Sequence, residues 1–226
     1  MSVRKLLHHN GLSIFFLAIF LAAVVFQSLA GWQDFNNDQL RHGGEEITFG
    51  RYVFSSEFGQ ALLENWQSEY LQFTLYILAT VWLLQKGSPE SKELDKGGGE
   101  SDERQKVGRH ASSSSPAWAR AGGLRTAIYS NSLVLVMATI WLVSWFGQSV
   151  TGRSSYNAEL LDHHQPPLSY LDYLGSAHFW ENTLQNWQSE FLAVGSMAIL
   201  AVYLRQRGSP ESKPVGATHD ATGQTG

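Results

Sequence analysis

The sequence predicts an all-α integral membrane protein with four transmembrane helices, arranged as two helical hairpins that repeat in parallel. Three observations lead to this fold class: long uncharged apolar runs, an internal repeat without gaps, and an uneven distribution of Lys and Arg. The mean hydropathy of −0.17 is typical of a soluble protein, but it averages apolar blocks with a polar linker and tail. The fold class therefore follows from the position of the apolar blocks.

The apolar runs come in two lengths. Residues 12–30 and 133–150 contain no charged side chain, and each is close to the ~20 residues that a helix needs to cross a bilayer. Residues 71–84 and 191–204 are shorter runs, roughly 21 Å of helix at 1.5 Å per residue. Each closely follows the pentapeptide NWQSE, so we expect its helix to begin inside that motif. The predicted spans are residues 11–30, 66–86, 132–151 and 187–207.

A cleaved signal peptide is the alternative for the first span. Arg4 and Lys5 form a basic start, and residues 28–31 resemble a cleavage site. A similar pattern recurs at residues 148–152, far inside the chain, where cleavage would cut the protein in two. We therefore expect the first span to remain in the mature protein.

A repeat relates the two halves of the chain with one offset of 121 throughout (125 − 4 = 213 − 92 = 121), and it contains both NWQSE and GSPESK twice. Each copy carries two spans, so both copies have the same orientation, which defines a parallel repeat about an axis along the membrane normal. Gene duplication alone explains the similarity, so the repeat is no evidence of a function. The predicted domains are a first hairpin (4–92), a linker (93–124), a second hairpin (125–213) and a tail (214–226).

The linker and the tail are rich in small and polar residues and nearly free of aliphatic side chains. Such segments bury too little apolar surface to fold, so we expect both to be disordered. Gly87 and Gly208 begin the two GSPESK segments and suit the residue that ends a helix. We interpret GSPESK as a helix stop followed by solvated chain; a recognition motif is the alternative.

Lys and Arg are concentrated on one side of the predicted membrane. The termini and the linker carry most of them, whereas the two loops between the paired spans carry only Arg41, Arg51 and Arg153. Segments rich in Lys and Arg stay in the cytoplasm. The sequence thus predicts a multi-pass protein of the inner (plasma) membrane, with both termini and the linker cytoplasmic and two acidic exported loops.

Each second span is expected to continue into the exported loop as one long helix. Aromatic and aliphatic residues recur there every four positions, which predicts helices over about 57–86 and 178–207. Thr48 and Ser169 precede aromatic stretches and are expected to cap short helices. The expected aromatic anchors are Trp66 and Trp187 at the outer interface and Trp82 and Tyr203 at the inner one.

We expect the glutamate of each NWQSE motif to lie near the outer edge of the hydrocarbon core, where a charged side chain costs free energy. Glu69 lies 15 residues before the inner end of its run, and Gln27 lies 15 residues after the start of its own run (84 − 69 = 27 − 12 = 15). A carboxylate in the membrane needs water or a partner, so we expect Glu69 to meet Gln27 and Glu190 to meet Gln148. The predicted intramembrane polar cluster is Gln27, Asn65, Glu69, Gln148, Asn186 and Glu190.

Three interpretations of this cluster stay open. In the first, the glutamates reach the outer surface or hydrogen-bond Gln27 and Gln148, and so hold the bundle together. In the second, Glu69 and Glu190 line a shared polar cavity and bind a cation, a proton or a small solute. In the third, they contribute to a metal-dependent catalytic site.

No arrangement of residues indicates catalysis or a cofactor. The chain has no Cys, which excludes disulfides and thiolate chemistry. His178 and Glu181 lie three residues apart and are metal-ligand candidates, but the first copy has Glu57 and Gln60 there. We therefore expect no metal, no cofactor and no enzyme, and the formal net charge of −4 does not indicate nucleic-acid binding.

The segments QSLAG, HFWEN, NWQSEFL and RQRGSPESK together resemble a family of bacterial membrane proteins described only as a domain of unknown function. The resemblance covers nearly all of both copies and implies an integral membrane protein built from hairpin units. It implies no activity, substrate or catalytic residue. The first copy departs from the pattern at residues 57–61, so a role that needs His178, Trp180 or Glu181 would exist once in the chain.

The sequence therefore predicts a non-enzymatic envelope component of unknown role, held together by polar contacts at the outer membrane edge. Its expected partners are the lipid bilayer and either a second copy or another membrane protein. The alternative is a small transporter or channel that uses Glu69 and Glu190, which also predicts a homo-oligomer because four helices hardly enclose a pathway. A metal-dependent membrane enzyme is the minor alternative.

Overall fold

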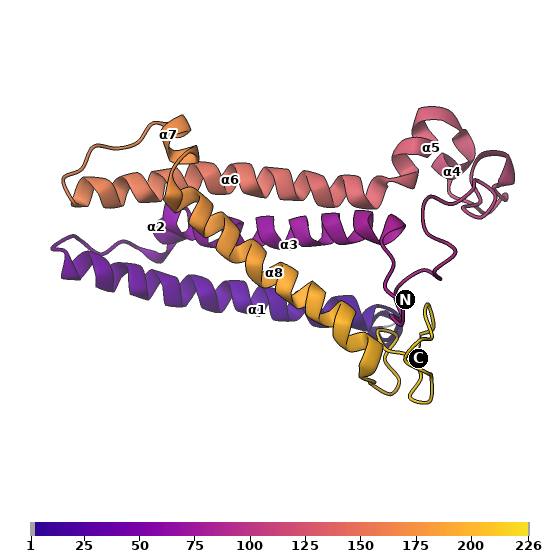
Figure 1. Cartoon of the computed structure of the whole chain (residues 1–226). Coiled ribbons are helices and arrows are strands. Elements are labelled where there is room, and N and C mark those ends of the chain that lie inside the picture. Colours follow the sequence, from indigo (N-terminus) through magenta and orange to yellow (C-terminus); the bar gives the residue numbers. More distant parts are fainter. Residues whose placement is uncertain (1–2, 226) are drawn as a thin grey trace. The chain divides into compact units, whose positions relative to one another are not determined.

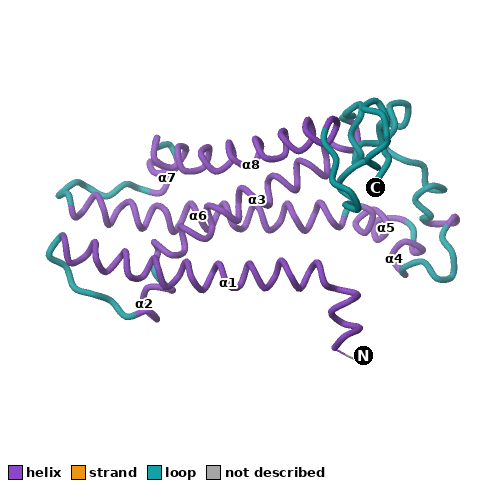
Figure 2. The backbone as a smooth tube through the Cα atoms, turned by 90° about the horizontal axis from the view of Figure 1, so that it is seen from below, coloured by secondary structure: helices purple, strands orange, loops and turns teal. Residues whose placement is uncertain are grey.

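The computed structural model describes residues 3–225, and in this range the chain forms helices and irregular segments without a β-strand (Figures 1 and 2). The predicted all-α class is therefore confirmed. The long helices are α1 (Val3–Arg41), α3 (Ser56–Trp82), α6 (Ser132–Asp162) and α8 (Ala177–Tyr203). The short elements are α2 (Phe49–Val53), η1 (Gly108–His110), α4 (Ala117–Ala121), α5 (Gly123–Ser130) and α7 (Tyr170–Leu174).

The helix bounds of the two halves differ by a constant number of residues. Helices α7 and α8 end 121 residues after α2 and α3 (174 − 53 = 203 − 82 = 121), and α6 ends 121 residues after α1 (162 − 41 = 121). The expected caps are confirmed, because the Arg51 amide donates to Thr48 Oγ1 at 3.4 Å and the Asp172 amide donates to Ser169 Oγ at 3.2 Å. Equivalent residues thus begin and end equivalent helices.

An asparagine marks the start of the apolar part of both α1 and α6. Asn10 has non-helical backbone angles inside α1, and its side-chain amide donates to the Leu6 carbonyl at 3.2 Å. Asn131 separates α5 from α6, and its side-chain amide donates to the Ala127 carbonyl at 2.8 Å. The long uninterrupted helices therefore start at the residues where the first and third spans were expected to start.

Two described helices are long and apolar enough to cross a membrane, α1 over Arg4–Arg41 and α6 over Ser132–Asp162. The expectation of four such helices is not met, because α3 and α8 do not reach the same hydropathy. Their first halves carry the polar NWQSE motifs, and they end at Trp82 and Tyr203. The chain thus leaves the helix four residues earlier than the expected ends at residues 86 and 207.

The two GSPESK segments cause these early ends, because each forms the same hydrogen-bonded turn. The Gln85 amide donates to Ser91 Oγ at 3.0 Å, and the Gln206 amide donates to Ser212 Oγ at 2.9 Å. The glycines that begin the turns, Gly87 and Gly208, have positive φ angles of 85° and 81°, a conformation that side chains disfavour. GSPESK is therefore a structured helix stop rather than solvated chain.

The chain comprises two compact units. One unit runs up to Leu62 and includes Val150–Pro167, and the other comprises Leu63–Ser149 and the chain from Leu168 onward. In the first unit, Asn36 clamps the backbone of Ile47 with two hydrogen bonds, at 3.0 and 2.9 Å. The rings of Tyr52 and Phe58 pack 5.5 Å apart in its buried interior.

The second unit packs α8 against α3 and α6. Its interior holds Tyr173 and Phe179, with ring centroids 5.5 Å apart, at the positions 121 residues after Tyr52 and Phe58 (173 − 52 = 179 − 58 = 121). Trp145 of α6 stacks on Phe179 at 6.3 Å. Both units therefore use the same aromatic pair, and the second unit adds a tryptophan to it.

Candidate functional site

The two NWQSE motifs contact each other directly within the second unit. The Trp187 indole Nε1–H donates to Gln67 Oε1 at 2.8 Å, and the Gln67 side chain is fully buried. Ser68 is also buried, and its hydroxyl lies within hydrogen-bond reach of the Glu190 carboxylate and, at 2.9 Å, of the Asn65 carbonyl. The middle of one motif therefore binds the second and last positions of the other.

The two glutamates of the motifs also act on each other through their charges. The Glu69 carboxylate lies close enough to Glu190 to repel its negative charge. Glu69 is exposed, whereas Glu190 is half-buried. The motif contact thus combines one neutral interhelical hydrogen bond with a pair of carboxylates at its edge.

The structure places the other members of the predicted polar cluster elsewhere. Gln148 is buried, and its Nε2 lies 3.5 Å from Thr183 Oγ1, one helix turn before Trp187. Asn186 donates to the carbonyl of Asn182 in its own helix at 2.8 Å. Gln27 is an exposed residue of the first unit, so its expected contact with Glu69 stays a prediction. Ser68 contacts Glu190, and the expected contact of Glu190 with Gln148 stays a prediction.

The sequence analysis missed Gln67, Ser68 and Thr183 as members of this contact. No feature of the sequence distinguishes Gln67 and Ser68 from Gln188 and Ser189, which occupy the same places in the second motif. Gln67 and Ser68 are buried, whereas Gln188 and Ser189 are exposed. Thr183 is fully buried and replaces Leu62 of the first copy (183 − 121 = 62). This polar residue at an apolar position was the one sequence signal that Thr183 takes part in the contact.

Aromatic rings surround the motif contact. Trp145 lies 6.1 Å from Trp187, 6.3 Å from Trp180 and 5.9 Å from Trp141, measured between ring centroids. Trp187 is therefore part of an indole cluster and of a hydrogen bond to Gln67. Trp82 and Tyr203, the expected inner anchors, are 62% and 60% exposed.

The metal-ligand candidates make ordinary polar contacts. His178 Nε2 lies 3.2 Å from the side-chain amide of Asn182, one turn along the same helix. Glu181 is exposed. Among residues 3–225, no three His, Cys, Asp or Glu side chains come together in an arrangement that would hold a metal ion. The geometry therefore gives His178 a helix-surface contact and no ligand set.

Comparison with known proteins gives a family and no characterised relative. Residues 3–224 match the model of a family described as Domain of unknown function (DUF6766). The match spans nearly the whole chain and confirms the expected membership of a family of unknown function. No curated protein and no solved structure matches the chain.

Proposed function

The chain belongs to the DUF6766 family, a domain of unknown function, and we propose that it is a non-enzymatic, multi-pass membrane protein in which α1, α3, α6 and α8 all span the bilayer. In this proposal, the two halves form a parallel repeat of helical hairpins. The paired NWQSE motifs join the second spanning helices of the two hairpins.

The apolar surface of α1 and α6 is the observation that carries this proposal. Only 6% of the most apolar stretch of α1 and 17% of that of α6 is buried. Leu12, Phe26 and Phe146 are among the side chains that are 64% exposed or more. Soluble proteins rarely expose contiguous apolar patches of more than a few hundred Å². Lipid chains would remove this surface from water.

The proposal gives α3 and α8 the same role for two reasons. Each has 27 residues, about 40 Å at 1.5 Å per residue, which exceeds the ~30 Å hydrocarbon core. Their bounds also follow each other at the offset of 121 residues that relates α2 to α7, which supports the parallel repeat.

The NWQSE contact is proposed to hold α3 against α8. A hydrogen bond between side chains of two helices within a bilayer contributes about 0.6–2 kcal/mol, and the Gln67–Trp187 bond joins α3 and α8 in this way. The position of Lys and Arg supports cytoplasmic termini and an inner-membrane location. The expected partners remain the bilayer and either a second copy or another membrane protein.

Membrane insertion and topology can be tested with single cysteines because the chain has none. We expect the protein to stay in the membrane pellet after alkaline carbonate extraction. In right-side-out vesicles, an impermeant maleimide should label Gln165→Cys, at the expected exported loop, and should spare Ser113→Cys in the linker. Release by carbonate would refute insertion, and the reverse labelling pattern would refute the topology.

A transporter or channel is the second candidate function, favoured by the proximity of Glu69 and Glu190. Two carboxylates beside a buried serine are suited to coordinate a cation. Proteoliposomes with the wild-type chain would then show a cation flux that Glu69→Gln and Glu190→Gln remove. A flux equal to that of empty liposomes would leave the motif contact with its packing role alone.

A further inference from the structure

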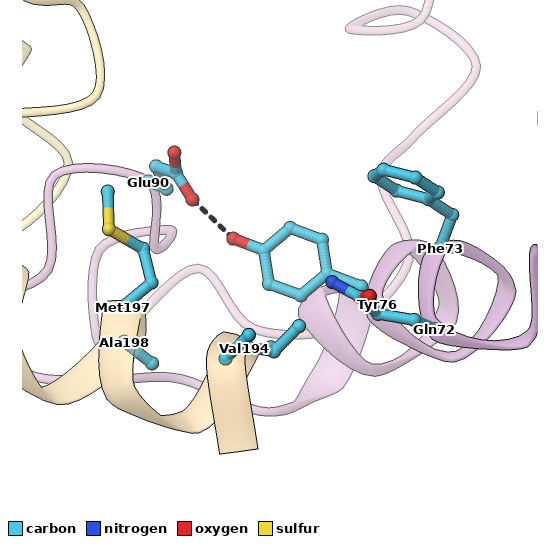
Figure 3. Close-up of a pocket in the computed structure, with 8 residues that line it drawn as sticks. Gln72, Phe73, Tyr76, Glu90, Val194, Met197 and Ala198 are labelled. Carbon is cyan, nitrogen blue, oxygen red and sulfur yellow. Dashed lines mark hydrogen bonds between the residues drawn. The ribbon is translucent and has the colours of Figure 1, made fainter. Parts of the chain in front are cut away.

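A pocket lies between α3 and α8 on the side of the GSPESK turns. It has a volume of about 230 Å³ and is lined mainly by apolar side chains from both helices. A second hollow of about 180 Å³ adjoins it and shares Tyr76, Glu90 and Met197. Together they lie in the lower part of the ~300–1,000 Å³ range of small-molecule sites. Figure 3 shows the ring of Tyr76 extending from α3 towards Glu90, with Met197 and Val194 on the facing helix.

The two copies of the repeat contribute side chains of different size to the pocket. Gln72 and Phe73 of α3 correspond to Ala193 and Val194 of α8 (193 − 72 = 194 − 73 = 121), and all four residues line the pocket. Tyr76 likewise corresponds to Met197. At each pair, α8 carries the smaller side chain.

Glu90 contributes a carboxyl group to the lining of the pocket. Tyr76 Oη donates a hydrogen bond to Glu90, and the Glu211 carboxyl forms a hydrogen bond with Glu90 from the second GSPESK turn. Glu90 and Glu211 are both exposed, and neither belongs to an ion pair among residues 3–225. Their contact raises the pKa of Glu211, because a hydrogen bond to Glu90 and the charge of Glu90 both favour the protonated acid.

Gln72, one of the residues that line the pocket, carries a buried polar atom. Gln72 Oε1 is buried and accepts no hydrogen bond, which costs free energy because its hydration is lost without replacement. The pocket therefore combines an apolar wall and an aromatic ring with the Glu90 carboxyl group, to which Glu211 is hydrogen-bonded.

We propose that this pocket binds an amphiphilic organic cation whose ammonium group contacts Glu90 and Glu211. The charge of the carboxyl pair selects the cation, the Tyr76 ring adds a cation–π contact, and the alkyl chain lies against Phe73 and Val194. This role goes beyond the proposed function, and it does not depend on how many helices span the membrane.

Binding can be measured by equilibrium dialysis of labelled octylammonium against the full chain in phosphatidylcholine nanodiscs, with empty nanodiscs as the background. We expect saturable binding of octylammonium and at least tenfold weaker binding of 1-octanol and octanoate, which have the same chain length without the positive charge. Equal binding of 1-octanol would overturn the proposal. Loss of octylammonium binding on addition of phosphatidylethanolamine would assign the site to a lipid headgroup and would also overturn it.

Two variants test the site itself. The double change Glu90→Gln and Glu211→Gln should weaken binding at least tenfold, whereas Glu93→Gln, which lies outside the pocket in an ion pair with Lys96, should not. The double change Ala193→Gln and Val194→Phe installs the residues of the first copy and should remove saturable binding. Unchanged binding in a variant that retains its helical circular dichroism would contradict the proposal.

The wild-type chain provides a test that needs no variant. The ammonium must displace the proton shared by the carboxyl pair, so affinity should increase as the pH rises through the raised pKa of Glu211. The ammonium itself keeps its charge over that range. An affinity that is independent of pH between about 4 and 8 would refute the proposed contact, whatever the variants show.

Discussion

The two NWQSE motifs have identical sequences and opposite environments. The first buries Gln67 and Ser68, whereas the second exposes Gln188 and Ser189 and uses Trp187 and Glu190, three residues apart on one helix face. The contact is therefore heterologous, with a different surface from each copy. A repeated motif identifies the two helices that meet, but which of its residues face the interface depends on the neighbouring helices.

The largest expected effect comes from the aromatic support that only the second copy has. Trp145→Val installs the residue of the first copy, Val24 (145 − 121 = 24), and removes the ring that contacts Phe179 and Trp187. We expect a loss of about 3 kcal/mol in the free energy of unfolding, measured by denaturant titration of the purified protein. Trp118→Val, at a 49% exposed position, is the control. Equal losses for both would contradict the proposed support.

The next effect compares the two glutamines of the motif. Gln67→Ala should destabilise the chain by about 1–3 kcal/mol, because the indole N–H of the half-buried Trp187 loses its acceptor. Gln188→Ala, at an exposed position, should stay within about 0.5 kcal/mol. Unfolding free energies of the two variants measure the difference. Similar values would show that both motifs contribute equally and would remove the asymmetry.

A smaller difference in stability is expected between variants of the lysines that end the two GSPESK turns. Lys213 is buried and donates to the carbonyls of Thr218 and His219 at 3.2 and 2.8 Å. Lys92 is more exposed and donates to the Gly98 carbonyl at 2.9 Å. We expect Lys213→Met to cost about 1–2 kcal/mol and Lys92→Met less than about 1 kcal/mol. Proteolysis of the tail should accelerate in the first variant only; acceleration in both would make the turns equivalent.

The smallest expected effect is a pH dependence. The pKa of Glu211 is raised in the folded chain, so the folded state holds the proton more tightly than the unfolded one, and this group favours folding at low pH. Its contribution should be lost as the pH rises from the ordinary glutamate range through the raised pKa. Glu211→Gln should flatten that part of the melting-temperature profile, and Glu93→Gln should leave it unchanged. An unaltered slope in Glu211→Gln would exclude the carboxyl pair as its cause.

The sequence predicted the helices better than the contacts. Helix starts near Ser56 and Ala177 and the caps at Thr48 and Ser169 follow from local chemistry, which a single sequence carries. The early helix ends follow from Ser91 and Ser212. Their hydroxyl groups accept hydrogen bonds from the backbone amides of Gln85 and Gln206, just after the last helical residues. These hydrogen bonds form in segments whose composition, rich in small and polar residues, predicts disorder.

The candidate site was predicted only in part. The motif itself and its glutamates were recognised, but the pairing of one motif with the other was not. Gln67 and Gln188 are the same residue in the same pentapeptide, so their difference in burial arises from tertiary packing, to which local sequence gives no access.

The asparagines at the start of the apolar helices have a consequence for bilayers of different thickness. Asn10 and Asn131 interrupt the helical backbone and return a side-chain hydrogen bond to the preceding turn. A bend at these residues therefore leaves fewer backbone carbonyls unsatisfied, which is the main cost of bending a helix in lipid. In the proposed membrane orientation, α1 and α6 could adjust their tilt to hydrophobic mismatch while the short basic segments before them stay at the cytoplasmic interface.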